Sequence, residues 1–404
     1  MPGARIERTP RTPSVEPRAG LWLGDLEFHD KPGTGEWGGH WPQAILDHMT
    51  SRLLVLGGTG FLGHAIVQAA LADREAGVPR WDVTTFNRGI SGVDSPGITP
   101  LRGDRYAPDS VDMLAESGPW DAVIDCSGYV PRNVLSVANA LDPRTSRYVF
   151  ISSVSAYAGW PTEPLTEQSE VLPAPPDAGP DFGTNTEDGP TQYGYQKAGC
   201  EAAAQAVFGI RAAVLRPGVI LGPREYVGRL IWWLNRFATG GLIVGPGRPD
   251  RAIQPIDVRD VARFAISCAR QELSGPYNVT APVGSSTFGS FLAACRDATD
   301  SDAQVKWFPD ETLLEAGVRQ WSEMPLWRVA GGVWDVDSTK AASDGLECRP
   351  LRATVMDTWA WMRSGSFVDG RDRAQEIGMS REREAELLRR LTRVADEPRV
   401  DLSG

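Results

Sequence analysis

The chain has 404 residues, of which 41% are apolar and 23% charged, and its formal net charge is -11. This composition can build a sizeable core, and the acidic balance argues against a general affinity for nucleic-acid phosphates. No stretch approaches the roughly 18 to 20 apolar residues of a membrane span, and no apolar signal-peptide core is present, so we expect a cytoplasmic protein. Five cysteines without CxxC spacing and only four histidines predict buried thiols and no metal site.

Residues 1–50 carry scattered Pro, Gly, Arg and Trp without helical or strand periodicity, and we interpret them as a leader outside the fold. Two readings of this leader stay open. Met49 stands just before the first predicted strand, which is typical of a start codon assigned too far upstream. Alternatively, Trp22, Trp37 and Trp41 pack on the body of the protein as a strap.

The first strand is predicted where four apolar residues run from Leu53 to Leu56. A GxGxxG pattern follows directly, and an amphipathic helix is predicted over 61–72. In this order the glycines allow a tight turn, a close approach to a pyrophosphate and close packing of the helix on the sheet. The residues predicted to bind a dinucleotide here are Gly57, Gly58, Thr59, Gly60, Phe61, Leu62 and Gly63.

The second predicted strand, 81–86, ends in Asn87, Arg88 and Gly89. NAD-selective folds usually carry an acid here that binds the ribose hydroxyls, whereas an arginine accommodates a 2′-phosphate. The stretch has no acid, so Arg88 predicts NADP(H) rather than NAD(H). The alternative is that Arg88 only caps a loop.

Two further strands are predicted over 98–104 and 121–126. The first ends in Gly103 and Asp104, which places Asp104 beside the adenine. The second ends before Ser127 and Gly128, which are positioned to pass along the cofactor.

A fifth strand, 147–153, is followed by a predicted helix over 193–208. The i, i+4 spacing places Tyr193 and Lys197 on one helical face, which Tyr195 cannot share with Lys197. A phenol beside an ammonium is typical of an acid/base pair, because the ammonium, helped by an oxidised nicotinamide, favours the phenolate. Lys197 is also predicted to hold the nicotinamide ribose.

On these motifs the chain resembles the extended or atypical short-chain dehydrogenase/reductase superfamily, close to its NAD-dependent epimerase/dehydratase branch. The resemblance covers roughly residues 51–361. The motifs that carry it are GGTGFLG at 57–63, FISSVSAY at 150–157, YGYQK at 193–197, RPG at 216–218 and PIDVRDVA at 255–262.

The resemblance implies that Ser153, Tyr193 and Lys197 are catalytic and that Arg216, Pro217 and Gly218 lead toward the nicotinamide. Val154 and Ser155 stand where sugar dehydratases of the family carry an Asp-Glu pair, which argues against a dehydratase. Ser155, Trp232 and Arg251 are predicted to bind substrate, Arg251 by analogy with an arginine that binds a nucleotide pyrophosphate.

The predicted fold is α/β, a doubly wound parallel sheet (Rossmann fold) with a smaller C-terminal substrate-binding lobe. Residues 160–192 hold seven prolines, seven acidic residues and no Lys or Arg, and we interpret this connection as a lid over substrate, with a floppy insertion as the alternative. The run 380–395 predicts a solvated helix. The expected segments are 1–50 (leader), 51–222 and 257–281 (dinucleotide-binding domain), 223–256 and 282–365 (substrate lobe) and 366–404 (helical tail).

The function that this resemblance implies is an NADP(H)-dependent oxidoreductase, a reductase or dehydrogenase, acting on a secondary alcohol or ketone of a small molecule. An NAD(P)-dependent nucleotide-sugar epimerase is the alternative enzyme. A third reading resembles the chloroplast stem-loop RNA-binding relatives, against which the intact Ser153, Tyr193 and Lys197 set and the acidic charge speak. The family's habit also suggests a homodimer.

Overall fold

The computed structural model describes residues 50–365, apart from 76, 91, 187 and 188, together with residues 377–396. The chain divides into units of residues 1–43 and 44–404, and every described residue belongs to the second unit. The predictions for the leader, residues 1–49, lie outside the described residues.

A sheet of seven strands, all paired in parallel, forms the centre of this unit. The strands in spatial order are β13 (Gly275–Val279), β8 (Ala212–Pro217), β7 (Thr145–Ile151), β6 (Trp120–Asp125), β1 (Ser51–Leu56), β4 (Trp81–Asn87) and β5 (Thr99–Arg102). The chain runs outward from β1 to β5, then returns to β6 on the other side of β1. This reversal confirms the doubly wound sheet and puts the ligand-binding crevice at the carboxyl ends of β1 and β6.

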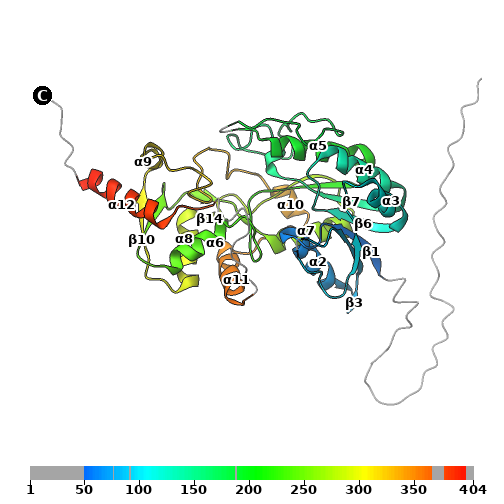
Figure 1. Ribbon diagram of the computed structural model, residues 1–404, viewed down its shortest axis with the longest axis horizontal. Helices are drawn as coiled ribbons and strands as arrows, with labels where there is room; N and C mark the ends of the chain where they lie inside the picture. Colours follow the sequence, from blue (N-terminus) through cyan, green and yellow to red (C-terminus); the bar gives the residue numbers. More distant parts are fainter. Residues whose placement is uncertain (1–49, 76, 91, 187–188, 366–376, 397–404) are drawn as a thin grey trace, which may run out of the picture. The chain divides into compact units, whose positions relative to one another are not determined.

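Alternating side chains of the strands build two cores, one on each face of the sheet. Leu53 and Val55 of β1 pack with helices α2 (Phe61–Ala72) and α7 (Val258–Arg270). Leu54 and Leu56 face the opposite side, which is covered by helices of the second core. These helices are α3 (Pro108–Ser117), α4 (Pro131–Leu141) and α5 (Gln192–Phe208), and Figure 1 shows the two helical layers on either side of β1, β6 and β7.

A third core lies in the C-terminal lobe, around fully buried Trp233 and Trp327. Its helices are α6 (Arg229–Ala238), α8 (Phe288–Thr299), α9 (Asp310–Glu315), α11 (Leu351–Arg363) and α12 (Arg381–Asp396), and its strands are β10 (Leu242–Pro246) and β15 (Gln304–Phe308). The remaining short elements are β2 (Arg74–Glu75), β3 (Val78–Pro79), β9 (Ile220–Leu221), β11 (Ala252–Ile253), β12 (Ile256–Asp257), β14 (Ser286–Thr287) and α10 (Thr339–Ser343).

Helix α12 is not a solvated tail. Leu387 and Leu391 pack into the third core, and the Glu384 carboxylate, 4% exposed, forms an ion pair with buried Arg236 of α6. The sequence did not predict this buried face, because most residues of α12 are charged and a narrow apolar stripe is enough to dock a helix.

The connection 160–192 contacts the body at several of its described positions, although other described residues in it are exposed. Leu165 exchanges backbone hydrogen bonds with the segment that precedes α10, donating to Asp335 O (2.9 Å) and accepting from Asp337 N (2.8 Å). Farther on, Phe182 lies edge-to-face against Tyr195 of α5. The described part of the connection is therefore not a floppy insertion, and its role as a lid stays a prediction.

Two helices of the second core were not predicted, although each has a sequence signal. Pro108 and Pro131 stand at the first turns of α3 and α4, where proline costs no hydrogen bond.

All five cysteines lack a disulfide partner, three of them buried and two half-buried. Among the described residues no helix is long and apolar enough to cross a membrane.

Candidate functional site

The carboxyl edge of the sheet brings together most of the predicted cofactor residues. The glycine-rich turn follows β1, Asn87 ends β4, and Ser127 and Gly128 follow β6. Ser153 stands two residues beyond β7, at the start of a short 3-10 helix over Val154–Ala156. Parallel strands place these segments side by side although they are far apart in the sequence.

The glycine-rich turn has the geometry that a dinucleotide needs. Gly57 has φ +96°, and a Cβ on Gly63 would lie 1.9 Å from Gly57 O, so both positions require glycine. A Cβ on Gly60 would meet no protein atom within 4 Å, and no side chain caps the first turn of α2. Backbone N–H groups at this helix start can therefore face a pyrophosphate.

The end of β4 differs from the prediction. Arg88 is exposed, because Asn87 Oδ1 accepts a hydrogen bond from Gly89 N (2.7 Å) in a tight turn that directs the intervening residue outward. An acid does reach this point, since Asp94 forms an ion pair with Arg102 beside Asn87. The statement that no acid lies here was wrong, because the segment after β4 folds back on the strand end.

Asp104 and Ser127 are both held by local hydrogen bonds. The Asp104 carboxylate accepts from Tyr106 N (3.0 Å), and Asp104 N donates to Ser110 Oγ (3.1 Å). Ser127 N donates to Asp125 Oδ1 (3.0 Å). Their contact with a cofactor stays a prediction.

A buried ion pair beneath Ser127 was not predicted. Arg105 donates to both carboxylate oxygens of Asp125 (2.8 and 2.9 Å) and to Ser127 Oγ (2.9 Å), and Tyr148 Oη donates to Asp125 Oδ2 (2.9 Å). Desolvation raises the pKa of Asp125, but the charge and hydrogen bonds of Arg105 outweigh it and the net pKa is lowered. The ion pair therefore fixes the carboxyl end of β6 under the cofactor site. In the sequence, the only feature that indicated this ion pair was an acidic residue, Asp125, at the end of a predicted strand.

Ser153, Tyr193 and Lys197 lie close together, where the segment after β7 meets the first turns of α5. Tyr193 is in the first turn of α5, 44% exposed, and shares a hydrogen bond with the Ser153 side chain. Lys197 is buried one turn later, where Nζ donates to Gly128 O and Ile151 O (2.8 Å each). An ammonium has three donors, so one remains for a ribose hydroxyl. The structure brings Tyr193, not Tyr195, to Ser153.

Two tyrosines at this site were missed. Tyr129 and Tyr226 are both exposed, and the charge of Tyr226 adds to desolvation, the largest cause, in raising the pKa of Tyr129 and of Tyr193. Lys197 Nζ lies 4.8 Å from the Tyr129 ring, and Tyr226 contacts the Phe61 ring edge-to-face at 6.5 Å. The position of Tyr129 directly after Gly128 could have identified it, whereas nothing in the sequence singled out Tyr226.

Without cofactor the pKa of Tyr193 is raised to about 12. Desolvation by the surrounding protein is the largest cause, and the hydrogen bond with Ser153 opposes it. Lys197 is directed to two carbonyl oxygens, so it does not offset this desolvation. The phenolate at neutral pH depends on the positive charge of an oxidised nicotinamide. The lowered pKa expected from the sequence includes an oxidised nicotinamide and stays a prediction.

We therefore expect no phenolate from Tyr193 below about pH 10, the ordinary pKa of a phenol, in the protein without cofactor. The measurement is the ultraviolet absorbance of tyrosinate in wild type minus that in Tyr193→Phe, followed as the pH rises. Addition of the oxidised cofactor should move the difference signal to lower pH. A signal well below pH 10 without cofactor would contradict the assignment.

The Arg216 side chain is buried in the protein interior. Its guanidinium binds Glu201 through two nitrogens (2.6 to 3.2 Å) and lies 4.5 Å from the Tyr157 ring. Glu201 of α5 therefore occupies two of the three guanidinium nitrogens, Nη1 is buried without a hydrogen-bond partner, and the predicted cofactor contact of this side chain stays a prediction. Gly218 N also donates to Val279 O (3.2 Å). Pro217 ends β8, so the predicted contact there is left to its backbone.

A cavity of about 860 Å³ in the C-terminal lobe contains Arg251, as predicted for a substrate pocket. Arg251 forms an ion pair with Asp310, which also accepts from Trp327 Nε1 (2.8 Å), while Arg251 Nη1 is buried without a hydrogen-bond partner. Trp334 also lines the cavity, and its ring lies 6.0 Å from Trp321.

A row of neighbouring side chains extends from this cavity toward Tyr193. Arg229 lowers the pKa of Tyr193 through its charge and lies 5.2 Å from the Trp321 ring. Trp160, which follows the Ser153 segment, contacts Trp321 edge-to-face at 6.4 Å. These contacts therefore connect the surroundings of Tyr193 with the cavity.

Trp232 does not line either cavity that we describe. Its ring packs edge-to-face on Trp233, and Nε1 donates to Met379 O (3.3 Å) just before α12. The residue is structural because the docked α12 segment covers it. Ser155 stays beside the site, where its N–H donates to Ser153 Oγ (3.1 Å).

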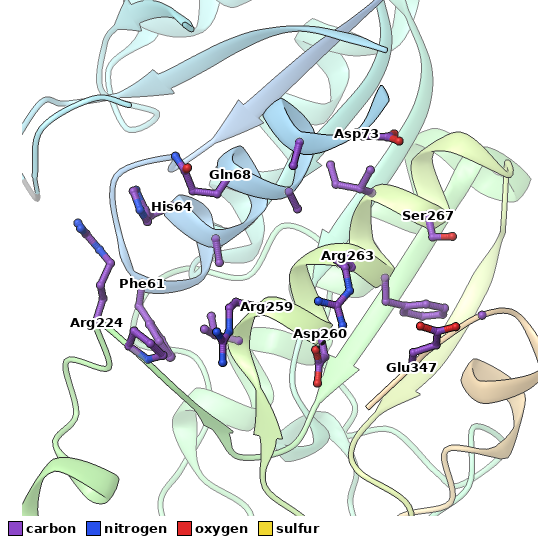
Figure 2. Close-up of a pocket in the computed structure, with 18 of the residues that line it drawn as sticks. Phe61, His64, Gln68, Asp73, Arg224, Arg259, Asp260, Arg263, Ser267 and Glu347 are labelled. Atoms are coloured by element: carbon purple, nitrogen blue, oxygen red, sulfur yellow. Dashed lines mark hydrogen bonds and ion pairs between the residues drawn. The ribbon is translucent and has the colours of Figure 1, made fainter. Parts of the chain in front are cut away.

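A further cavity of about 750 Å³ lies between α2 and α7 (Figure 2). Phe61, His64 and Gln68 project into it from α2, and Arg259 and Arg263 from α7. Arg224 lies beside His64 and lowers its pKa, after desolvation as the larger cause. Arg224 and Arg251 therefore line different cavities.

Comparison with known proteins is consistent with this geometry. A family model described as "NAD dependent epimerase/dehydratase family" matches residues 53–280, more than half of the chain. A search of curated proteins found no significant match.

Several solved structures share the fold at low sequence identity. The enzyme WbmH of Bordetella bronchiseptica in complex with NAD+ matches with a TM-score of 0.57 and 15% identity over 79% of this chain and 100% of its own. A UDP-N-acetylglucosamine 4-epimerase from Methanobrevibacter ruminantium M1, in complex with UDP-N-acetylmuramic acid, matches with a TM-score of 0.57 and 19% identity over 78% and 99%. A putative epimerase from Burkholderia cenocepacia J2315 matches with a TM-score of 0.55 and 20% identity over 78% and 98%.

Proposed function

Since the chain belongs to the NAD dependent epimerase/dehydratase family, we propose that it interconverts a secondary alcohol and a ketone with a nicotinamide dinucleotide. The observation that carries this proposal is the meeting of Ser153, Tyr193 and Lys197 beside the glycine-rich turn. The turn fits a dinucleotide because Gly60 leaves open space at the uncapped start of α2.

In the reducing direction, Tyr193 Oη donates its proton to the carbonyl oxygen of the substrate, while Ser153 Oγ donates a hydrogen bond to the same oxygen. A bound nicotinamide supplies the hydride from its C4. Lys197 holds the loop after β6 through Gly128 O, and the positive charge of the oxidised nicotinamide would favour the phenolate left on Tyr193. In the oxidising direction Tyr193 takes the proton back from the alcohol.

A net reductase or dehydrogenase is our first candidate. The cavity in the C-terminal lobe supports it, because two of its three arginines are paired with carboxylates, and the third, Arg328, lies over the Trp160 ring at 5.0 Å. Arg251 is paired with Asp310 and Arg248 with Asp250, and Glu311 and Asp335 add further carboxylates. Such a cavity suits an uncharged substrate with aromatic or apolar surface better than a diphosphate.

A nucleotide-sugar epimerase is the second candidate, in which the same residues oxidise and re-reduce one carbon. Arg251 Nη1, buried without a partner, favours it, because a pyrophosphate oxygen could accept from this atom. The solved structures named above include a UDP-sugar epimerase.

Deuterium transfer tests the shared chemistry. The protein is incubated with reduced cofactor deuterated at the transferring C4 position and with panels of ketones and of UDP- and dTDP-sugars. We expect deuterium in an alcohol product together with net oxidation of the cofactor. Turnover of a nucleotide sugar without net oxidation would favour the epimerase, and transfer to neither panel would contradict the proposal.

Nucleotide binding separates the two candidates independently of turnover. We expect UDP, dTDP and GDP to leave the melting temperature of the cofactor-saturated protein unchanged, because the carboxylates around Arg251 repel a diphosphate. A nucleotide at a hundred times its Kd would stabilise the protein by about 2.7 kcal/mol, which thermal denaturation detects easily. Stabilisation that disappears in Arg251→Ala would instead favour the epimerase.

A further inference from the structure

The cavity of about 750 Å³ between α2 and α7 (Figure 2) takes no part in the proposed reaction. Among the described residues that line it, only Phe61 was predicted to bind cofactor. Phe61, Ala65 and Ala69 follow one another at a spacing of four residues, so the cavity lies along one face of α2. Its volume is in the range of sites that hold small organic molecules. The structure therefore offers a second site outside the crevice at the carboxyl ends of β1 and β6.

The inner wall of this cavity is apolar. On α2 the short side chains of Ala65 and Ala69 leave room between the two helices. Val258 and Phe264 line the cavity from α7, and both are almost completely buried. Trp361 of α11 contributes a half-buried indole. An alkyl or aryl group of a ligand would therefore leave water when it enters.

The rim of the cavity carries an excess of positive charge. Among its described lining residues are four arginines and three acids, namely Arg224, Arg259, Arg263 and Arg270, and Asp73, Asp260 and Glu347. Their direct ion-pair partners just outside the cavity are two arginines and two aspartates, which leaves this excess unchanged: Arg80, Arg349, Asp257 and Asp357. In a chain with a formal net charge of -11, this rim favours an anion.

The charge of Arg263 is only partly neutralised. Arg263 Nη2 donates to Asp260 Oδ1 (2.6 Å), but Arg349 binds the same carboxylate through its backbone N and two guanidinium nitrogens (2.7 to 2.8 Å). Two guanidinium groups therefore share one carboxylate. The Arg263 side chain is 52% exposed and that of Asp260 is fully buried, so a ligand can reach the cation more easily than the anion.

Arg224 adds positive charge where α2 begins. Figure 2 shows its side chain beside His64 and Phe61. The pKa of His64 is lowered by desolvation and, as the smaller cause, by the charge of Arg224. The guanidinium charge of Arg224 therefore acts inside the cavity, and the imidazole, which stays neutral at neutral pH, does not add to it.

We propose that the cavity between α2 and α7 binds an amphipathic carboxylate, with the apolar chain against Val258 and Phe264 and the carboxylate at Arg263. The single excess charge of the rim matches a monoanion and not a diphosphate. This inference goes beyond the proposed function, since it requires neither cofactor nor turnover.

Calorimetry on the full chain tests the proposal with hexanoate, octanoate and decanoate. We expect one molecule bound per chain and a Kd that falls about fourfold with each added methylene, which corresponds to about 0.8 kcal/mol. Octyltrimethylammonium and 1-octanol should bind at least about tenfold more weakly than octanoate, because they lack the negative charge. Absence of carboxylate binding, or equal binding of the cationic amphiphile, would overturn the proposal.

Arg263→Gln locates the carboxylate, because it removes the charge while Asp260 keeps its bonds from Arg349. The Kd of octanoate should rise about fivefold to tenfold, as for a partly exposed charge-assisted hydrogen bond, and that of 1-octanol should not change. Arg296→Gln is the matched control. Arg296 is also a helical arginine, 52% exposed and paired with an aspartate, but it lines neither described cavity. Equal weakening in both variants would show a general effect of charge and would overturn the site.

Ala69→Phe tests the apolar wall, because a benzyl group on α2 occupies the space that the chain of the ligand needs. Octanoate binding should be lost while the melting curve and cofactor binding show a folded protein. Unchanged octanoate binding would contradict the placement of the chain. Saturating reduced cofactor should leave the Kd of octanoate in wild type unchanged, and competition would show that the carboxylate enters the dinucleotide crevice instead. Failure of the cofactor to bind would count against the proposed function alone.

Discussion

Tyr193→Phe should lower kcat about a hundredfold to ten-thousandfold while cofactor binding is retained, the range expected when a positioned proton donor is lost. The ring can keep its place at the start of α5, but the hydroxyl that shares a hydrogen bond with Ser153 is gone. Turnover is measured with whichever substrate accepts deuterium from the cofactor, and binding by the fluorescence of the reduced cofactor.

Tyr195→Phe is the matched control, because Tyr195 lies two residues away on α5 and packs against Phe182 on the outer side of the helix. It should retain nearly full activity. Equal losses in the two variants would show that the effect comes from α5 packing rather than from a proton. Reversed losses would show that the other phenol carries the proton.

Removal of the buried carboxylate beneath the cofactor site has the largest expected effect on stability. Asp125→Ala leaves Arg105, 8% exposed, as an unpaired buried charge, and Tyr148 without its acceptor. We expect a loss of about 3 to 5 kcal/mol in the free energy of unfolding, measured by urea denaturation. Glu75→Ala, which breaks an exposed ion pair with Arg80, should cost about 1 kcal/mol or less.

The contribution of Asp125 to the free energy of unfolding depends on pH in a defined direction. The folded-state pKa of Asp125 is lowered, so its contribution is fully present above the unfolded value of about 3.9 and is lost as the pH falls through the folded pKa. The stability difference between wild type and Asp125→Asn should therefore shrink only in acid. A difference that stayed constant down to strongly acidic pH would show that ionisation of Asp125 does not stabilise the fold.

Local patterns in the sequence were sufficient to predict the parallel sheet and the glycine-rich turn. The run of apolar residues from Leu53, the glycines at fixed spacing and the helix after them are consecutive, so no distant contact was needed to interpret them. Helix α2 begins and ends where it was predicted, at Phe61 and Ala72. The i, i+4 spacing of Tyr193 and Lys197 likewise depends only on helical geometry.

Contacts between distant segments decided the rest. Glu201 and Arg216 come from α5 and β8, and they form a buried ion pair that the sequence did not predict. Trp232 lies next to buried Trp233 in the sequence, yet only the docking of α12 shows that Met379 covers it. Neither arrangement has a short-range signature, because an ion pair or an aromatic contact needs proximity in space and not in sequence.

The sequence by itself therefore determined the order of the elements, the dinucleotide turn and the spacing of the catalytic pair, all of which follow from backbone geometry within a few residues. Only the tertiary structure decided which charge stands at the end of β4, since Asp94 is seven positions beyond Asn87 and reaches it through a chain reversal held by Arg102. It also raises the pKa of Tyr193 in the protein without cofactor, because desolvation depends on every segment packed around the phenol.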